Sequence, residues 1–467
     1  MERTLIKDIG EHEGKDVVLM GWVAVRRDHG KIIFIDLRDR SGIAQCVFVA
    51  KNADLYAQAE TLRPEWVIKL TGTVSKRPEN MVNPDTVNGA WEVKVSAVEI
   101  LNEATTPPIA IDTDGYDIGE EHRLKYRYLD LRRERLQANL RLRHEVIAHM
   151  RDHLNDRDFV EVETPIISKA TPEGARDYLV PSRVHPGKSY ALPQSPQQYK
   201  QLLMTAGLER YYQFARCFRD EDTRGDRQPE FTQLDLEMSF VKQEDVMNLM
   251  ETLYIDTITT LMPEKKIQQI PFPRLTYKEA MEKYGSDKPD IRTDKNDPNL
   301  LAFCWVIDFP FFEKTDAGAW TFTHNPFSAA QPEYADALMK KEAIGGILAA
   351  QYDLALNGYE IGGGSIRNHT AEGLRSVLEI MGYDEARIKE SCGHMLEAFT
   401  YGTPPHGGIA MGIDRLLAIL ANEPNIREVI AFPKTGDARD LMMDAPSPLA
   451  KSQLEEVGLE LKNPSQK

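Results

Sequence analysis

The chain has 467 residues, of which 42% are hydrophobic and 28% are charged, a length and composition typical of a globular protein of two to four domains. It contains no run of about 18 apolar residues and no apolar core in its charged N-terminal stretch, so we expect a cytoplasmic protein without a membrane segment or secretory signal. The net charge of −16 argues against nucleic-acid binding by the surface as a whole, and four separated cysteines without a CxxC pair argue against structural zinc.

The N-terminal part has the pattern of a small β-barrel. We predict a helix at 53–62 and strands at 17–27, 32–39, 43–49, 67–74 and 91–101. Three strands, a helix and two strands in this order are typical of the oligonucleotide-binding (OB) barrel, although any small barrel would fit the pattern. We therefore expect an OB-type domain over residues 1–103.

The next segment separates two predicted domains. Residues 104–133 include two prolines and little apolar periodicity, which predicts a hinge; the strongly basic stretch 122–151 is a candidate basic strip. Helical periodicity over 134–156 predicts a long helix, and the strand that follows it, FVEVETPII, is stopped by Pro165. Beyond it, helices and strands mix without a βαβ rhythm, which favours an antiparallel sheet with helices, an α+β domain over 134–467.

A dense run of charges, FRDEDTRGDRQPEF at 218–231, joins two strands of alternating character. The alternation predicts an apolar face on each strand and a polar floor carrying Arg219, Asp235 and Glu237, although a solvated outer face would alternate in the same way. The loop between the strands adds Arg227 and returns through Phe231. Fork-shaped cations beside an aromatic ring suit a flat, phosphate-rich ligand.

A second cluster surrounds the Asn-Gly pair at 357–358, a strong signal for a two-residue hairpin turn. A turn there would pair Asp353 with Gly362 and place the carboxylates of Asp353 and Glu360 on one face of the sheet. We predict that these carboxylates hold one divalent cation, with two independent surface acids as the alternative. The glycines that follow allow a ligand to approach the backbone and lead to Arg367.

Three other stretches supply candidate residues. A Gly-rich strand at 407–412 enters a helix whose first turn holds Arg415, where a cation opposes the helix dipole and so suggests an anionic ligand. Glu173 lies in a loop marked by Gly and Pro, and a predicted helix places Gln197 and Lys200 on one side. No P-loop or dinucleotide-binding glycine motif is present, so a nucleotide would be bound in another way.

These clusters, in this order, resemble the class II aminoacyl-tRNA synthetases and, within them, the bacterial-type aspartyl branch. FVEVETPII is similar to the first class motif, the dimer motif around Pro165; FRDED to RQPEF is similar to the second, and GGIAMGIDR to the third. Asp414 stands where many class members have Glu, and the aspartyl branch commonly has Asp there. The large domain that the bacterial type usually carries between the second and third motifs is missing here, near residues 293–302.

The resemblance implies a homodimer that joins L-aspartate to ATP, with Mg²⁺, and passes the aspartyl group from the adenylate to tRNA. It implies that Arg219, Arg367 and Arg415 are catalytic and that Asp353 and Glu360 bind the metal. The residues that it assigns to ATP are Arg219, Asp220, Glu221, Arg227, Gln228, Phe231, Glu360, Gly412, Ile413, Asp414 and Arg415. The residues that it assigns to aspartate are Glu173, Gln197, Lys200, Arg219, Asp235, His324 and Arg367.

Family roles can be carried over in more detail. Arg219 would hold the α-phosphate, and Phe231 and Arg415 would stack on the two faces of adenine. The substrate's ammonium group would contact Glu173, Gln197 and Asp235, and its side-chain carboxylate would contact Lys200 and Arg367, while His324 closes the site.

Rival functions remain open at this level. Lys200 and Arg367 argue against an asparaginyl enzyme, since a neutral amide would leave a buried cation uncompensated. The complete set of charged motif residues argues against a non-catalytic protein that binds RNA or a metabolite.

In the barrel, we predict that Phe34 stacks on an anticodon base, unless it belongs to the barrel core, and that base edges contact Arg27, Gln45 and Glu92. Some family members charge only tRNA-Asp, whereas others also charge tRNA-Asn, and an amidotransferase then repairs the product. The resemblance associates a histidine at His29 with the relaxed form, but relaxed members often have Gly at the position of Asn80. We favour the relaxed form, with strict specificity for tRNA-Asp, or a merely solvated His29, as the alternative.

Overall fold

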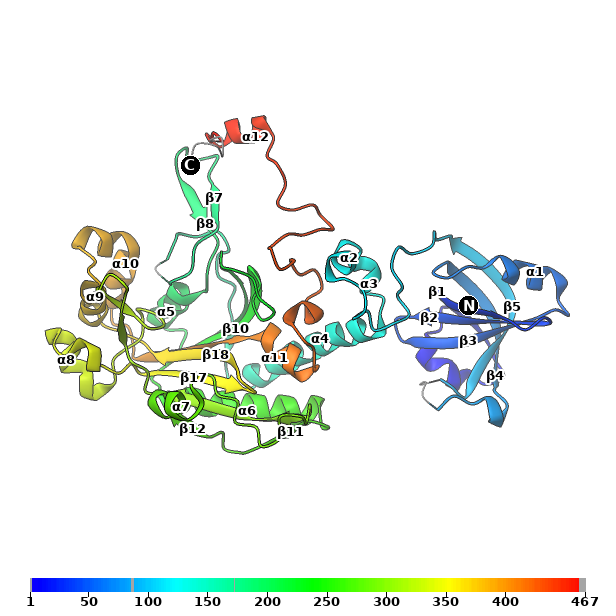
Figure 1. The fold of residues 1–467 in the computed structure, drawn as a ribbon, viewed down its shortest axis with the longest axis horizontal. Coiled ribbons are helices and arrows are strands. Elements are labelled where there is room, and N and C mark those ends of the chain that lie inside the picture. The colour runs from blue at the N-terminus through cyan, green and yellow to red at the C-terminus, as the bar shows by residue number, and fades with distance from the viewer. Residues whose placement is uncertain (1, 85–87, 172, 462–467) are drawn as a thin grey trace. The chain divides into compact units, whose positions relative to one another are not determined.

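The computed structural model describes residues 2–84, 88–171 and 173–461 (Figure 1). The chain forms two compact units, Met1–Arg133 and Glu134–Lys467. The segment 104–133, predicted to be a hinge, falls in the first unit and contains two short helices, α2 (Glu120–Lys125) and α3 (Arg127–Asp130). All four cysteines are buried and free. Within the described ranges, no helix is long and apolar enough to cross a membrane.

A closed five-stranded barrel lies in the first unit, with the strand order β1-β2-β3-β5-β4 (Figure 1). Its strands are β1 (Asp16–Asp28), β2 (Ile32–Asp39), β3 (Gly42–Val49), β4 (Val67–Lys76) and β5 (Trp91–Asn102), with helix α1 (Ala53–Thr61) between β3 and β4. Each bound lies within two residues of the prediction. Because side chains alternate along a strand, Ile33 and Ile35 fill the barrel core while Phe34 faces outward, which excludes the core interpretation of Phe34.

An eight-stranded sheet organises the second unit, in the order β12-β14-β17-β18-β19-β10-β9-β6. These strands are β12 (Arg274–Thr276), β14 (Phe303–Ile307), β17 (Gln351–Leu356), β18 (Tyr359–Ile366), β19 (His406–Gly412), β10 (Glu230–Ser239), β9 (Arg210–Phe218) and β6 (Val160–Glu161). The pairs from β14 to β9 are antiparallel, and the two edge pairs, β12 with β14 and β6 with β9, are parallel. The predicted α+β class is confirmed. The strand expected before Pro165 is shorter than predicted, because it pairs with β9 at only two residues.

Three helices cover one face of this sheet: α4 (Glu134–Asn155), α6 (Gln243–Leu261) and α11 (Ile413–Leu420). Their apolar residues join those of the central strands in one large core, which includes Leu234, Leu236 and Ile409. On the opposite face of β10 the polar residues therefore remain for a site.

The remaining elements are shorter or lie around this sheet. They are η1 (Ile6–His12), η2 (Glu79–Met81), β7 (Leu179–Pro181), β8 (Ser189–Ala191), α5 (Gln197–Thr205), β11 (Lys266–Ile267), α7 (Tyr277–Tyr284), β13 (Leu300–Leu301), β15 (Phe312–Lys314), β16 (Trp320–Phe322), η3 (Pro332–Tyr334), α8 (Ala335–Lys340), η4 (Ile344–Gly346), α9 (Ala371–Ile380), α10 (Glu385–Phe399), η5 (Ile426–Val429) and α12 (Lys451–Glu456). Helices α9 and α10 pack together around a separate apolar cluster.

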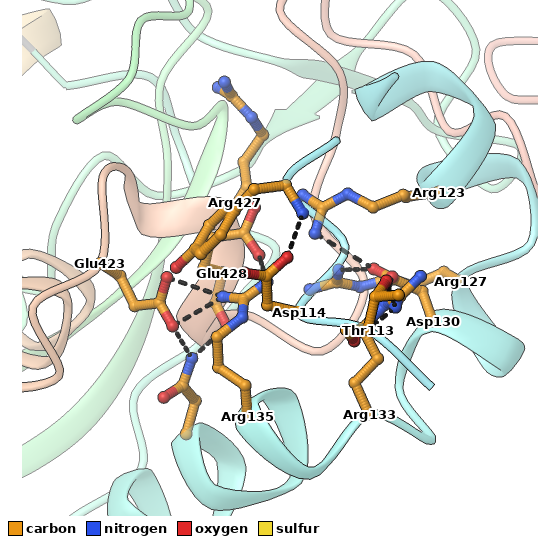
Figure 2. Close-up of polar contacts among 12 residues, drawn as sticks. Thr113, Asp114, Arg123, Arg127, Asp130, Arg133, Arg135, Glu423, Arg427 and Glu428 are labelled. Carbon is orange, nitrogen blue, oxygen red and sulfur yellow. Dashed lines mark hydrogen bonds and ion pairs between the residues drawn. The ribbon is translucent and has the colours of Figure 1, made fainter. Parts of the chain in front are cut away.

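Several arginines of the basic stretch 122–151 form ion pairs inside the protein (Figure 2). In the first unit, the fully buried carboxylate of Asp130 accepts hydrogen bonds from Arg127 at 2.7 Å and Arg133 at 2.6 Å. In the second unit, Arg135 donates to both carboxylate oxygens of Glu423 at 2.7 Å. Internal ion pairs, and not only exposed cations, therefore account for the charge of this stretch.

Removing the charge of Asp130 tests how much this group of ion pairs stabilises the first unit. We expect Asp130→Asn to lower the free energy of unfolding of the first unit by about 3 kcal/mol or more, because buried guanidinium groups lose their shared carboxylate. Urea unfolding followed by circular dichroism measures the change. The control Glu99→Gln removes an exposed pair with Lys69 and should cost less than about 1 kcal/mol. Equal stability of the two variants would contradict the expectation.

Candidate active site

Two adjoining cavities lie over the polar face of the central strands. One measures about 200 Å³ and the other about 260 Å³. They share the lining residues Arg219, Glu221, Gln233, Glu360 and Ala410. The floor forms because Leu234 and Leu236 of β10 point into the core, which turns Asp235 and its polar neighbours to the other side.

The smaller cavity, here called the arginine cavity, holds most of the residues predicted to bind the nucleotide. Those that line it are Arg219, Glu221, Arg227, Gln228, Phe231, Glu360, Gly412, Asp414 and Arg415. Asp220 does not line it; its backbone exchanges hydrogen bonds with Arg176. Ile413 does not either, because its side chain is fully buried in the apolar core with the other apolar residues of α11.

Two arginines of this cavity, Arg219 and Arg415, contact other residues of the protein. The Arg219 guanidinium lies 5.1 Å from the centre of the Phe231 ring, a cation–π contact. Arg415 donates to the backbone oxygen of Glu360 at 2.7 Å and pairs with Asp226 at 3.3 Å. In this structure Arg219, and not Arg415, lies on Phe231, so adenine stacking between Phe231 and Arg415 stays a prediction.

Asp414 links three elements beneath the arginine cavity. Its Oδ1 accepts a hydrogen bond from Arg143 of α4 at 2.5 Å, and its Oδ2 accepts one from the backbone N–H of Thr232 at 3.0 Å. Both carboxylate oxygens are thus engaged by the protein. This arrangement fixes the first turn of α11, which carries Arg415.

The larger cavity, here called the carboxylate cavity, holds every residue predicted to contact the amino acid. They are Glu173, Gln197, Lys200, Arg219, Asp235, His324 and Arg367. Asn325, which stands where the resembled family usually has a second histidine, also lines it.

Buried ion pairs define the electrostatics of the carboxylate cavity. The Lys200 ammonium lies 2.6 Å from Asp235 Oδ1 and 3.2 Å from Glu237 Oε2. Arg367 donates to both oxygens of Glu237, at 2.9 and 3.2 Å. Burial favours the neutral form of Glu237, but the charges of Arg367 and Lys200 prevail and hold its pKa below the usual range. The sequence placed Glu237 beside Asp235 but gave no sign that it binds both cations.

Asp235 and Glu173 of this cavity keep unused acceptor capacity. Burial raises the pKa of Asp235, and its Oδ2 has no hydrogen-bond partner among the described residues. Burial also raises the pKa of Glu173, whose carboxylate accepts from Ser195 at 2.6 Å and Thr171 at 2.9 Å. Buried carboxylates with unused acceptor capacity suit a cationic group such as an ammonium.

The hairpin that carries the predicted metal ligands differs from the expected register. Ala355 pairs with Glu360 as the turn dictates, but a bulge follows and Asp353 pairs with Gly363, not Gly362. The two carboxylates still share a face, since a Cβ added at Gly363 would lie 2.6 Å from Asp353 Oδ1 and 3.8 Å from Glu360 Oε1.

The electrostatics of this carboxylate pair fit a cation. Burial and the charge of Glu360 raise the pKa of Asp353 well above its ordinary value. His324 Nδ1 lies 3.9 Å from Asp353 Oδ2. A divalent cation would neutralise this repulsion, so the donor set fits Mg²⁺, although no cluster of three or more acidic, His or Cys ligands occurs in the described part of the chain.

The predicted anticodon residues share one outer face of the barrel. Strand pairing places Arg27 opposite Phe34, and Gln45 opposite Glu92. Gln45 donates to Glu92 at 3.2 Å, and Arg27 forms a two-point ion pair with Asp36.

The two residues predicted to select the tRNA lie in different surroundings. The His29 ring lies edge-on to Phe34, with 5.5 Å between ring centres, so it belongs to the same face as the predicted base-stacking residue. Asn80 lies exposed in η2.

Comparison with known families matches both units. Residues 119–436 match the family described as tRNA synthetases class II (D, K and N), and residues 17–101 match the OB-fold nucleic acid binding domain of the anticodon-binding type. Among solved structures, an asparaginyl-tRNA synthetase from Pyrococcus horikoshii superposes with a TM-score of 0.76 over 93% of this chain and 98% of its own, at 24% identity, which supports the fold.

Two curated relatives are similar over almost their whole length. Proteins named aspartate–tRNA(Asp/Asn) ligase from Rubrobacter xylanophilus and Mycobacterium avium are 42% and 41% identical, each over 96% of this chain and 95% and 96% of their own. The first alignment runs over 572 positions, whereas this chain has 467 residues. The relative therefore contains residues without a counterpart in this chain, and the missing domain near residues 293–302 stays a prediction.

Proposed function

We propose that this chain, which belongs to the class II tRNA synthetases of the D, K and N type, attaches L-aspartate to tRNA in two steps. In the first, an α-carboxylate oxygen of aspartate attacks the α-phosphorus of ATP, and the bond to the β-phosphate breaks to release pyrophosphate. In the second, a hydroxyl of the terminal ribose of tRNA attacks the aspartyl carbonyl, and AMP leaves. The observation that carries the proposal is the buried Lys200–Glu237–Arg367 group, whose two cations line the carboxylate cavity.

The chemistry of that group favours aspartate over asparagine. Lys200 and Arg367 offer only N–H donors, so they match a carboxylate, which only accepts. The amide of asparagine would turn N–H groups toward the same donors, and such a mismatch is strongly rejected in a buried site. Asp235 and Glu173 would accept hydrogen bonds from the ammonium group, which aspartate and asparagine both carry. Exchange of pyrophosphate into ATP with asparagine in place of aspartate would overturn this assignment and favour the asparaginyl alternative.

In the arginine cavity, the residues act by binding and orientation. Arg219 reaches both cavities, so it would hold the α-phosphate beside the amino-acid carboxylate and stabilise the charge that develops there. Arg227 would bind the terminal phosphates, and Phe231 would carry the adenine with Arg415. His324 would close the carboxylate cavity and help exclude water.

Asp353 and Glu360 would hold the magnesium ion. Bound there, the ion would supply positive charge to the phosphates of ATP. Exchange that persists in excess EDTA would contradict this part of the proposal.

We also propose that the chain works as a cytoplasmic homodimer. Pro165 is followed by two exposed isoleucines, Ile166 at 41% and Ile167 at 53%, next to the exposed Val160 of β6. Exposed apolar residues along one edge of a sheet suit a contact with a second copy. A monomeric mass in light scattering at micromolar concentration would refute the dimer, and recovery in the membrane fraction of cells would refute the location.

Loss of the Arg219 charge tests the reaction itself. We expect Arg219→Ala to lower aspartate-dependent ATP–pyrophosphate exchange by roughly 100-fold or more, because one stabiliser of transition-state charge contributes about 3 kcal/mol. The matched control is Arg216→Ala, an arginine three residues earlier, in β9, that donates to Glu230 and Thr232 away from both cavities. If the wild-type protein shows no aspartate-dependent ATP–pyrophosphate exchange, the non-catalytic alternative holds. If Arg219→Ala exchanges at the wild-type rate, Arg219 does not stabilise the charge at the α-phosphate.

The relaxed choice of tRNA is tested at His29. A neutral imidazole can donate to or accept from a base edge, so it can tolerate both anticodons, and His29→Leu should favour tRNA-Asp over tRNA-Asn by about 10-fold. Charging of the two purified tRNAs by wild type and variant measures the ratio. Wild type that rejects tRNA-Asn by several orders of magnitude would establish strict specificity. An unchanged ratio in His29→Leu would show that another residue selects. In the relaxed case an amidotransferase must convert aspartyl-tRNA-Asn.

A further inference from the structure

A chain of three buried polar side chains leads from the carboxylate cavity into the interior. Gln197, which lines the cavity, donates through Nε2 to Gln201 Oε1 at 2.9 Å. Gln201 Nε2 lies 3.0 Å from His406 Nε2, and His406 Nδ1 lies 2.8 Å from the backbone oxygen of Pro404. Gln201 and His406 are fully buried, so these contacts cannot exchange with water.

The end of this chain fixes the direction of every hydrogen bond in it. A backbone oxygen only accepts, so His406 Nδ1 must carry a proton. Burial lowers the pKa of His406 although the charge of Glu237 opposes it, which favours the neutral ring, and in a neutral ring protonated at Nδ1 the Nε2 atom accepts. Gln201 must then turn its NH₂ group to His406 and its oxygen to Gln197.

The orientation of Gln201 in turn determines the orientation of the Gln197 amide. Because Gln201 presents an oxygen, Gln197 must present its NH₂ group to it, and the Gln197 oxygen is the end left for the cavity. We infer that Gln201 and His406 are positioning residues that hold the Gln197 oxygen as an acceptor for the ammonium group of the substrate. With Glu173 and Asp235, Gln197 then gives three acceptor side chains for an ammonium with three N–H donors.

The reversed orientation would have the opposite effect. If Gln201 turned its NH₂ group to Gln197, then Gln197 would turn its own NH₂ group into the cavity, toward the N–H groups of an ammonium. The direction of the chain therefore decides whether the cavity accepts or rejects an α-amino group. This inference rests on the proposed aspartate substrate, but its test measures binding and does not require the reaction.

The test compares two ligands that differ only in the ammonium group, L-aspartate and succinate, by isothermal titration calorimetry. Gln201→Met keeps the length of the side chain and removes both hydrogen bonds. We expect it to weaken aspartate binding roughly 10- to 100-fold, the effect of a misplaced hydrogen bond to a charged group. Succinate binding should stay within about threefold of wild type, and exchange at saturating aspartate should fall much less than the aspartate affinity.

Two further variants complete the test. Gln201→Glu can only accept, so Gln197 must still donate to it, while His406 takes up a proton at Nε2 and donates to the other carboxylate oxygen. The ratio of aspartate to succinate affinity should therefore stay close to wild type. Thr403→Val is the matched control, because it removes a partly buried hydrogen bond to Thr205, which lies in the same helix as Gln201 but outside the chain of three.

The outcomes separate the two hypotheses. Equal weakening of both ligands in Gln201→Met, no weakening of aspartate, or a lost ratio in Gln201→Glu would overturn the positioning role. If Gln201→Met does not fold, the ratio in Gln201→Glu decides. Intact aspartate binding by a wild type that performs no exchange would overturn the proposed reaction instead.

Discussion

The buried carboxylate of Glu237 is the interaction on which the candidate site depends. It binds Lys200 of α5 and Arg367 at the end of β18, and so connects two elements to the central strand β10. A buried cation is costly unless an anion compensates it, and these charges are almost completely removed from water. Each of the three therefore needs the others, and the cavity has a fixed shape before any ligand enters.

Charge is distributed unevenly along the site. At the end with Lys200 and Arg367, the protein balances its own charges, so a ligand there is selected by hydrogen-bond direction. Asp353 and Glu360 repel one another and favour a cation, while the arginine cavity favours an anion. A substrate with a carboxylate, an ammonium and a chain of phosphates matches this order.

Helix α4 connects the site to the exposed edge strand. Arg143 of this helix holds Asp414 at the start of α11, and the same helix leads directly into β6 and the segment around Pro165. A contact made at that edge is thus linked to the helix that carries Arg415 through α4 and the hydrogen bond from Arg143 to Asp414.

Local patterns predicted what depends on local geometry. The barrel strands follow from two-residue alternation, and the pairing of Ala355 with Glu360 follows from the Asn-Gly turn. The contact between Gln201 and His406 joins residues far apart in the chain, which periodicity cannot reveal. Arg127 and Arg133 lie three residues from Asp130, but the spacing alone does not tell that these charges are buried. A motif gives the position of Ile413 but not the direction of its side chain, whereas the apolar spacing of α11 does give that direction, into the core. A contact of Ile413 with a nucleotide would therefore be made by its backbone, and it stays a prediction.

The bulge in β18 changes which side of the sheet the later residues of the strand face. Glu360 and Arg367 are seven positions apart, an odd number, so a regular strand would send them to opposite sides of the sheet. Ile361 lies in the core, and a Cβ at Gly362 would run into Met411, so two successive residues occupy the core side. Because of this one extra residue, every side chain after it faces the side of the sheet opposite to the one it would face in a regular strand. The carboxylate that favours a metal and the arginine that selects the substrate can therefore face one cavity, and deletion of a single residue here would separate them.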